Sequence, residues 1–249
     1  MIELNNLSIG YGKRTVLDGI SVNFDKGRLV SVIGVNGCGK STLLKSIAGI
    51  LPIQSGDVTI DGRQITSMKR NDIAQRISYL CQGRTVPDMS VEQLVLHGRF
   101  PYLSYPRRYS KKDKQIAENA MDAVGIKELA KSALDVISGG MRQSAYIAMA
   151  LSQDTEYIFM DEPTTYLDIS HQIKIMKLLR TLADSGKCIV SVMHDLPMAF
   201  EYSDEIVVLD KTLKIIKDSP QSLCGSSVIQ EVFGVNLSSN NENGKYYYT

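Results

Sequence analysis

The stretch that decides the fold is Gly34-Val-Asn-Gly-Cys-Gly-Lys-Ser-Thr42, which has the form Gly-x-x-x-x-Gly-Lys-Ser/Thr. Its glycines let backbone N–H groups close around phosphate oxygens, where a Cβ atom would clash. Lys40 can reach the β- and γ-phosphates of a nucleotide, and the Ser41 hydroxyl can bind Mg²⁺. The loop therefore predicts binding of a nucleoside triphosphate together with its magnesium ion.

The residues on either side of this loop supply the context that such a loop requires. Residues 28–33 form a short apolar run rich in β-branched side chains, which predicts a buried strand. Residues 41–48 carry apolar side chains at helical spacing, which predicts a helix. The first N–H groups of that helix would point at the same anion.

The rest of the chain predicts an α/β core interrupted by a helical segment. Strand-like runs separated by Gly, Asn and Asp turns lie at residues 2–9, 15–24, 29–33, 57–60 and 77–81. Helix-like segments follow at residues 90–96, 110–124 and 138–151. From residue 157 strands and helices alternate again, which favours parallel βαβ construction.

We therefore expect one domain over residues 1–237. Its nucleotide-binding α/β core would comprise residues 1–85 and 154–237, and residues 86–153 would form a helical subdomain. The Asn- and Ser-rich residues 238–249 predict a flexible tail. A docking role for the three consecutive tyrosines of that tail, Tyr246 to Tyr248, is the alternative.

Composition describes an ordinary soluble globular protein. The chain has 249 residues and a net charge of +1, so nothing in its overall charge predicts a nucleic-acid partner. No apolar stretch approaches membrane-spanning length. The first residues lack the basic start and apolar core of a signal peptide, so we expect none.

The four cysteines are scattered without a Cys-x-x-Cys pair, which argues against structural zinc and a disulfide framework. Cys81 and Cys188 lie in apolar, strand-like runs and are expected to be small buried thiols. Cys38 differs because it lies near a helix N-terminus and Lys40, both of which favour a thiolate. An oxidisable thiol at Cys38 is therefore a hypothesis that the structure can test.

A second constellation consists of acidic residues at the end of an apolar strand, Tyr157-Ile-Phe-Met-Asp-Glu-Pro163. Asp161 is placed to hold Mg²⁺, and Glu162 is placed to take the proton from an attacking water. A further apolar run, residues 188–193, ends at His194. This histidine could contact the γ-phosphate, directly or through water, or could be satisfied by the backbone alone.

Residues 137–143, Ile-Ser-Gly-Gly-Met-Arg-Gln, open the helix that is expected to run to residue 151. Ser138 is a plausible N-cap, and Gly139 and Gly140 allow close approach by another backbone or a phosphate. The residues by themselves leave open whether this is a phosphate contact or a simple helix start.

Together these residues resemble the nucleotide-binding subunits of ATP-binding-cassette (ABC) transporters, and the resemblance spans residues 1–235. Residues 34–42 resemble the Walker A loop of that family, residues 137–143 its signature motif, and residues 157–162 its Walker B strand. Gln82 is similar to the Q-loop glutamine, residues 165–168 to the D-loop, and His194 to the switch histidine. Tyr11 is similar to the aromatic residue that stacks on adenine.

The resemblance implies a P-loop NTPase (RecA-like) α/β core with an antiparallel β subdomain and an inserted helical subdomain. It implies that two chains pair head to tail around two ATP molecules, with each phosphate loop facing the signature motif of its partner. Nucleotide contacts are then assigned to Tyr11, Gly34, Asn36, Gly37, Cys38, Gly39, Lys40, Ser41, Thr42, Ser138, Gly139, Gly140 and Asp168. Catalytic roles fall to Glu162, His194, Gln82 and Lys40, and magnesium contacts to Ser41, Gln82 and Asp161.

The branch of the family is indicated by His97-Gly-Arg-Phe-Pro-Tyr-Leu103 and by residues 168–172 and 194–199. These segments look like the branch that imports ferric siderophores, haem and cobalamin. That resemblance implies a peripheral ATPase at the cytoplasmic face of the cell (inner) membrane, bound to transmembrane permease subunits and served by an extracytoplasmic substrate-binding protein. Met141 and Ser144 depart from the usual signature pattern and put fine contacts at the dimer interface in doubt.

Two other functions fit a single cassette without a membrane span. One is a soluble ABC-type ATPase of iron–sulphur cluster assembly, which co-purification with soluble scaffold proteins rather than a permease would indicate. The other is a non-catalytic nucleotide-binding module. Glu162 and His194 argue against the second, because degenerate sites often lose one of these residues.

Overall fold

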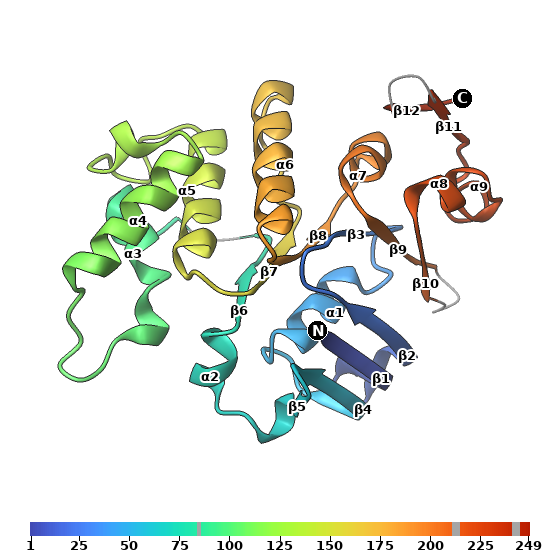
Figure 1. Ribbon diagram of the computed structural model, residues 1–249, viewed down its shortest axis with the longest axis horizontal. Coiled ribbons are helices and arrows are strands. Elements are labelled where there is room, and N and C mark those ends of the chain that lie inside the picture. Colours follow the sequence, from blue (N-terminus) through green and yellow to red (C-terminus); the bar gives the residue numbers. More distant parts are fainter. Residues whose placement is uncertain (84–85, 211–214, 241–244) are drawn as a thin grey trace.

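The computed structural model describes residues 1–83, 86–210, 215–240 and 245–249. Its centre is a six-stranded sheet with the strand order β10-β9-β3-β8-β7-β6 (Figure 1). The strands are β3 (Leu29–Gly34), β6 (Ile77–Leu80), β7 (Tyr157–Asp161), β8 (Cys188–Val192), β9 (Glu205–Leu209) and β10 (Ile215–Asp218). Every neighbouring pair is parallel except β9 and β10, so the expected parallel α/β core is confirmed.

A second, antiparallel sheet lies against the first and has the order β2-β1-β4-β5. Its strands are β1 (Ile2–Tyr11), β2 (Arg14–Phe24), β4 (Ile53–Ile60) and β5 (Arg63–Gln64). Helix α1 (Lys40–Ile47) contacts β1 of this sheet and β3 and β7 of the core sheet, so it is packed between the two. The antiparallel subdomain that the resemblance implies is therefore present.

Alternation along β3 explains how the core sheet buries both faces. Val30 and Val32 belong to the apolar cluster shared with α1 and the antiparallel sheet. Leu29 and Ile33 point the other way, into the cluster formed by the helices on the opposite face. Those helices include α6 (Ile169–Asp184) and α7 (Leu196–Tyr202). A strand covered on both sides has to be apolar throughout, which is why residues 28–33 read as a continuous run.

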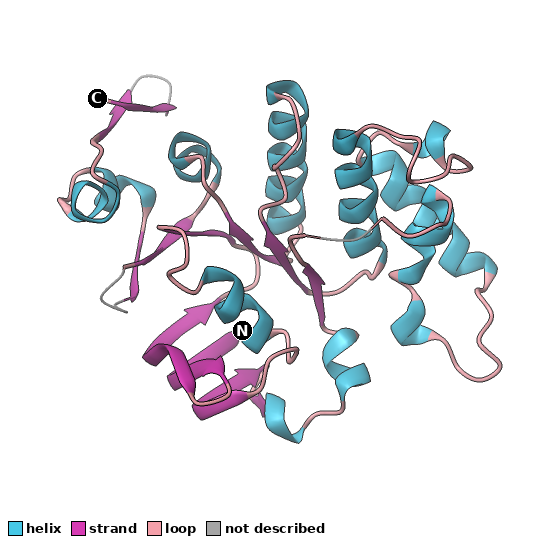
Figure 2. Ribbon diagram, turned by 180° about the vertical axis from the view of Figure 1, so that it is seen from behind, coloured by secondary structure: helices cyan, strands magenta, loops and turns pink. Residues whose placement is uncertain are grey.

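The helical subdomain contains α3 (Val91–His97), α4 (Lys111–Ala123) and α5 (Gly139–Ser152), which contact one another at one end of the core sheet (Figure 2). Each begins at a serine whose side chain accepts a hydrogen bond from the backbone N–H three residues later. Helix α2 (Arg70–Ala74) and the short 3-10 turns η1 (Ile65–Ser67), η2 (Phe100–Tyr102) and η3 (Lys127–Leu129) connect the larger elements.

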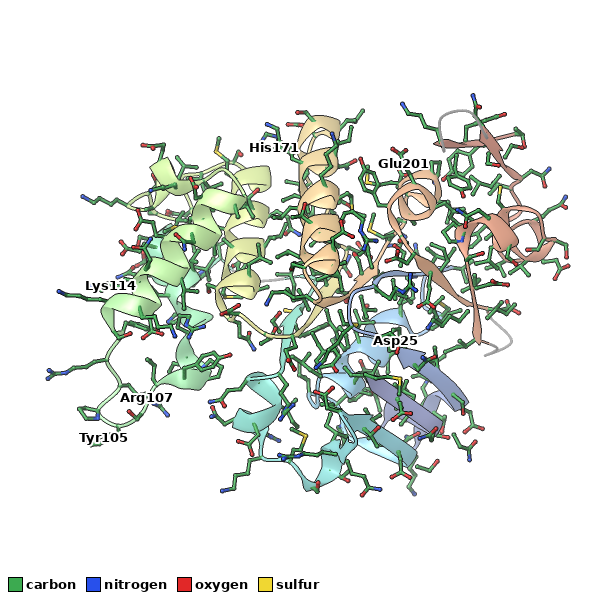
Figure 3. All side chains as sticks on the ribbon, in the orientation of Figure 1. Asp25, Tyr105, Arg107, Lys114, His171 and Glu201 are labelled. Atoms are coloured by element: carbon green, nitrogen blue, oxygen red, sulfur yellow. The ribbon has the colours of Figure 1, made fainter. Side chains whose placement is uncertain are left out.

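The loop between α3 and α4 carries the aromatic residues Phe100, Tyr102 and Tyr105, and a buried ion pair holds its first residues in place. The Arg99 Nε donates to the Asp113 carboxylate at 3.0 Å, and its Nη1 donates to the carbonyl of Ser152 at 3.0 Å. Both charged residues are buried. At the tip of the loop Tyr105 is almost fully exposed and points away from the body of the molecule (Figure 3). The Arg107 guanidinium instead lies over the Phe100 ring, 4.4 Å from its centroid.

The C-terminal segment differs from the expected flexible tail. After α8 (Pro220–Cys224) and α9 (Val228–Phe233), strands β11 (Leu237–Asn240) and β12 (Lys245–Tyr248) pair as an antiparallel hairpin. The Tyr246 ring packs edge-on against Phe200 of α7, with centroids 5.4 Å apart. The many polar residues of this segment predicted a frayed tail. The segment is ordered instead because one of its side chains makes an apolar contact with a helix that is distant in the sequence. Residues 241–244 of this segment lie outside the described residues.

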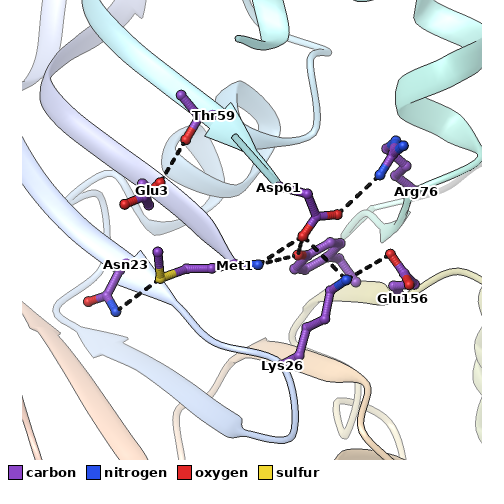
Figure 4. Close-up of polar contacts among 9 residues, drawn as sticks. Met1, Glu3, Asn23, Lys26, Thr59, Asp61, Arg76 and Glu156 are labelled. Carbon is purple, nitrogen blue, oxygen red and sulfur yellow. Dashed lines mark hydrogen bonds and ion pairs between the residues drawn. The ribbon is translucent and has the colours of Figure 1, made fainter. Parts of the chain in front are cut away.

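A polar cluster connects the antiparallel sheet to the core (Figure 4). Asp61, in the turn after β4, accepts hydrogen bonds from the Met1 amino group at 2.9 Å and from the Tyr157 hydroxyl at 2.6 Å. Lys26 and Arg76 form ion pairs with the same carboxylate, at 3.3 and 3.1 Å. Burial by itself would raise the pKa of Asp61, but these donors and charges outweigh it and lower the pKa to about 2.

Over the described part of the chain, no helix has both the length and the apolar composition needed to cross a bilayer.

Candidate nucleotide-binding and catalytic site

The site lies where parallel strands end side by side. The phosphate loop follows β3, His194 follows β8, Glu162 follows β7, and Gln82 follows β6. These four strands are neighbours in the sheet, so their carboxyl ends bring together residues that are distant in sequence. The sequence predicted each strand separately, and the strand order explains why their terminal residues meet.

The phosphate loop leaves the start of α1 open to an anion. Gly39 precedes the helix with φ of 103°, in the left-handed region that glycine tolerates and other residues avoid. No side chain caps α1, and its first turn carries no acidic residue. The N–H groups of this turn therefore lack a side-chain acceptor, which is the arrangement that binds phosphate.

Lys40 is held inside the loop that it is expected to serve. Its side chain is buried, and its Nζ donates to the carbonyls of Gly34 at 2.7 Å and Val35 at 3.0 Å. An ammonium group has three donors, so exchanging carbonyls for phosphate oxygens would need only a small movement. The charge is thus positioned beside the anion site in advance.

A cavity of about 980 Å³ opens beside this loop. Ten of the residues assigned from the sequence line it, namely Tyr11, Asn36, Gly37, Gly39, Lys40, Ser41, Thr42, Gln82, Glu162 and His194. Tyr11 lies at one end of β1 and is half exposed. A cavity with an exposed aromatic ring, a phosphate loop and an acid has the parts needed for a nucleotide and an attacking water.

Two further lining residues, Arg14 and Val16, were not expected. Both lie in β2, whose register places Arg14 opposite Tyr11. The signal that could have found them is the short Gly12-Lys13 turn between two strand-like runs, since a hairpin places the residues flanking its turn side by side.

Both carboxylate oxygens of Glu162 contact polar side chains. His194 Nε2 lies 2.5 Å from Oε1, and Gln82 Nε2 donates to Oε2 at 2.6 Å. Glu162 also has φ of 54°, an unfavourable conformation for a residue with a side chain, and Gln143 donates to the next carbonyl, that of Pro163, at 2.9 Å. The local fold thus holds this acid at the end of β7 in an orientation that an ordinary strand would not produce.

Asp161 is buried one residue earlier, and its environment fits a metal ligand. Its Oδ1 is buried without a hydrogen-bond partner among the described residues, whereas Oδ2 accepts from the Tyr79 hydroxyl at 3.3 Å. A buried carboxylate oxygen without a partner is costly unless a ligand satisfies it. Mg²⁺ is typically bound through one or two protein oxygens together with nucleotide phosphates, so Asp161 and Ser41 have the donor chemistry that the ion requires.

The surroundings of Cys38 do not favour the thiolate that the sequence suggested. The side chain is buried, and its sulfur would lie 2.7 Å from a Cβ atom at Gly34, so it packs tightly under the loop. Burial raises the pKa of the Cys38 thiol, and this outweighs the opposing effects of the Lys40 charge and of the neighbouring backbone N–H groups. The sequence showed the favourable charges, but only the packing showed how little water reaches the sulfur.

Two parts of the signature motif lie differently relative to the site of their own chain. Gly139 and Gln143 line a smaller cavity together with Glu162, whereas Ser138 and Gly140 do not reach the phosphate loop. Ser138 caps α5 and is exposed, accepting from the Met141 N–H at 3.2 Å. A Cβ atom at Gly140 would lie 3.2 Å from the Tyr166 carbonyl, so the start of α5 is close to the loop before α6. Neither Ser138 nor Gly140 lines the 980 Å³ cavity.

Asp168 behaves as the N-cap of α6. It accepts from the His171 N–H at 2.9 Å and contacts the His171 Nδ1 at 2.8 Å. These hydrogen bonds from His171 lower the pKa of the Asp168 carboxyl. Asp168 does not line the nucleotide cavity either. Ser138 and Asp168 are exposed, and Gly140 is half-buried.

A phosphate loop after β3, together with a buried acid and a doubly hydrogen-bonded glutamate at the end of β7 in the same parallel sheet, defines a P-loop ATPase. The ABC transporter family matches residues 17–165, more than half of the chain. The chain belongs to the ABC transporter family and is an ATPase of that family.

Two curated relatives cover nearly the whole chain. The petrobactin import ATP-binding protein FpuD of Bacillus anthracis is 39% identical over 234 residues, covering 93% of this chain and 86% of the relative. The ferric enterobactin transport ATP-binding protein FepC of Escherichia coli is 38% identical over 231 residues, covering 92% and 85%.

Solved structures share the fold. A metal-chelate type ABC transporter in an inward-facing conformation matches with a TM-score of 0.84 and 25% identity, covering 100% of this chain and 96% of that one. The dimeric bacterial ABC transporter cassette MJ0796 matches with a TM-score of 0.78 and 26% identity, covering 88% and 99%. The P-loop core with its antiparallel and helical subdomains is thereby confirmed.

Proposed function

We propose that this chain is the ATP-hydrolysing subunit of an importer for a ferric siderophore or a related metal chelate. The observation that carries the proposal is the grip on Glu162 by Gln82 and His194, at the edge of the same cavity as Lys40. The transported class is supported by the relatives, whose names refer to petrobactin import and ferric enterobactin transport.

In the proposed reaction Lys40 and the first N–H groups of α1 bind the β- and γ-phosphates, and Tyr11 stacks on the adenine. Glu162 accepts the proton of the attacking water, with His194 and Gln82 orienting its carboxylate. Asp161 and Ser41 would hold a magnesium ion, with Gln82 as a further contact, and the ion would neutralise phosphate charge. Gln82 could bridge metal and base because its amide has both an acceptor and donors.

The proposed active form is a head-to-tail pair of chains. The exposure of Ser138 and its separation from the nucleotide cavity of its own chain support this assignment, because the residue then remains available to the nucleotide of a second copy. The dimeric form of the MJ0796 cassette supports it as well. Gly139, Gly140 and Asp168 would take part in the same interface.

The proposed partners are transmembrane permease subunits and, through them, an extracytoplasmic substrate-binding protein. The chain would work as a peripheral protein at the cytoplasmic face of the membrane. The full-length match to a metal-chelate type transporter supports this proposal over the alternative of an ATPase for iron–sulphur cluster assembly.

The test is growth on a ferric siderophore as the sole iron source in a strain lacking this gene. We expect the wild-type gene to restore both growth and uptake of the radiolabelled iron chelate, and Glu162→Gln to restore neither. Uptake that does not depend on the gene, together with isolation of the chain on a soluble scaffold protein and not on a permease, would favour the cluster-assembly alternative.

A further inference from the structure

Tyr79 contacts the acid expected to hold magnesium, although no sequence motif drew attention to it. Its hydroxyl donates to Oδ2 of Asp161 at 3.3 Å. The other oxygen of that carboxylate, Oδ1, is buried and has no hydrogen-bond partner among the described residues. One oxygen is therefore bound by the protein and one is left for a ligand.

Strand register explains how the contact arises. Strands β6 and β7 are parallel neighbours, and Tyr79 is paired with Phe159. Asp161 lies two residues beyond Phe159 on the same face, about 7 Å further along the strand. A tyrosine leaning along its strand can span that distance, so its hydroxyl arrives at the carboxylate two positions ahead.

A hydrogen bond to one oxygen restricts rotation of the carboxylate about its terminal torsion, which is otherwise broad. With Oδ2 engaged, Oδ1 is kept in one direction. Partners that hydrogen-bond a metal ligand commonly orient it in this way, and removing them lowers metal affinity by roughly 10–100-fold.

We propose that Tyr79 is a positioning residue that orients Asp161 for the metal ion of the nucleotide. The inference rests on the proposed magnesium site and adds to it a residue that does not line the nucleotide cavity. Tyr79 therefore acts by holding the carboxylate, and loss of its hydroxyl should affect the metal more than the nucleotide.

Tyr79→Phe is the direct test, because it removes the hydroxyl and keeps the ring, which lines a cavity of about 340 Å³ together with Gly49 and Ile73. Tyr157→Phe is the matched control. Tyr157 lies at the start of β7, the strand that ends at Asp161. It also donates to a carboxylate, that of Asp61, which is paired with Lys26 and Arg76. Asp161→Asn serves as the reference for loss of the metal ligand.

Two affinities are measured for each purified full-length variant. The first is the Kd of Mn²⁺, used as a paramagnetic probe, for the complex with a non-hydrolysable ATP analogue, followed by electron paramagnetic resonance. The second is the Kd of a fluorescent ATP analogue in EDTA. We expect Tyr79→Phe to raise the Mn²⁺ Kd by about 10-fold and to leave the metal-free nucleotide affinity within about twofold of wild type. Tyr157→Phe should leave both affinities unchanged.

The possible results distinguish failure of the positioning role of Tyr79 from failure of the magnesium site at Asp161. If Asp161→Asn weakens Mn²⁺ binding and Tyr79→Phe does not, the positioning role is overturned and the magnesium site stands. If Asp161→Asn itself leaves the Mn²⁺ Kd unchanged, the proposed magnesium site fails, and the inference fails with it. Equal weakening in Tyr79→Phe and Tyr157→Phe would indicate a general loss of stability and would also overturn the positioning role.

Discussion

Glu162 shows how much of this site depends on single side chains. Its carboxylate lies between a histidine at 2.5 Å and a glutamine amide at 2.6 Å, and its backbone is in the left-handed region. These contacts restrict rotation of the carboxylate, as the proposed role of Glu162 as general base requires.

We expect Glu162→Gln to lower ATP hydrolysis by about 10²–10⁴-fold, because an amide cannot accept the proton of the attacking water. ATP binding should persist, since the residues proposed to bind the phosphates are unchanged. Phosphate release and binding of a fluorescent ATP analogue measure the two effects. Glu156→Gln, at an exposed glutamate paired with Lys26, is the control that should retain activity. Near-normal turnover in Glu162→Gln would contradict the assignment of the base.

Asp61 predicts an acid-sensitive contribution to stability. Its pKa is lowered from 3.8 to about 2 in the folded protein. A carboxyl whose folded pKa is depressed stabilises the fold at pH values above its unfolded pKa and loses that effect as the pH falls through the folded pKa. The shift corresponds to about 2 kcal/mol that is present at neutral pH and declines between pH 3.8 and about 2.

Urea unfolding of wild type and Asp61→Asn at pH 7 and at pH 3 measures this contribution. The difference in free energy of unfolding between the two proteins should be largest at pH 7 and should be smaller at pH 3. A difference that stays constant over this range would show that the carboxylate is not the group responsible.

At the scale of elements, the C-terminal segment is where the structure differs most from the expectation, because a paired hairpin replaces the expected flexible tail. Strand β12 contacts helix α7, and that helix begins directly after His194 and Asp195. The contact has a defined centre in the edge-on packing of Tyr246 against Phe200. Alternation along β12 separates this ring from Tyr247, which is about half exposed.

The hairpin predicts different effects for two adjacent tyrosines. Tyr246→Ala should lower the free energy of unfolding by about 1–3 kcal/mol, because it removes an aromatic pair and uncovers the buried Phe200. Tyr247→Ala should change it by less than about 0.5 kcal/mol. Chemical unfolding measures both values, and hydrogen exchange of the hairpin amides reports the local loss of order. Equal effects at the two positions would contradict the docking of the hairpin on α7.

At the scale of the whole molecule, the signature motif and the phosphate loop lie on different parts of one chain. Ser138 opens a helix of the helical subdomain, whereas Lys40 opens a helix of the core. Ser138 is exposed and does not line the nucleotide cavity of its own chain. A second copy offers the simplest way for both motifs to contact one nucleotide, and we therefore expect pairing to depend on Mg·ATP.

Light scattering of the Glu162→Gln protein should therefore detect a dimer with Mg·ATP and a monomer without nucleotide. Adding Ser138→Ala should weaken the dimer by about 10-fold or more, since it removes a hydroxyl expected to contact the partner's phosphate. Ser110→Ala is the matched control, because Ser110 also caps a helix of the same subdomain and each substitution costs about 1 kcal/mol of stability. Pairing that is equally affected by both substitutions would contradict the interface.

The sequence by itself determined the phosphate loop, the strands around it, and the acids and histidine at the ends of those strands. This was possible because the loop from Gly34 to Thr42 specifies its own chemistry through local backbone freedom and residue type. Buried parallel strands add a local signal of their own, since both of their faces are apolar.

Only the tertiary structure decided how those residues act on one another. Strand order placed His194 and Gln82 on the two oxygens of Glu162, and strand register brought the Tyr79 hydroxyl to Asp161. Burial reversed the expectation for Cys38, and contact with Phe200 ordered the tail around Tyr246. The physical reason is common to all four results. Burial, register and packing depend on residues far away in the chain, so they become defined only when the chain has folded.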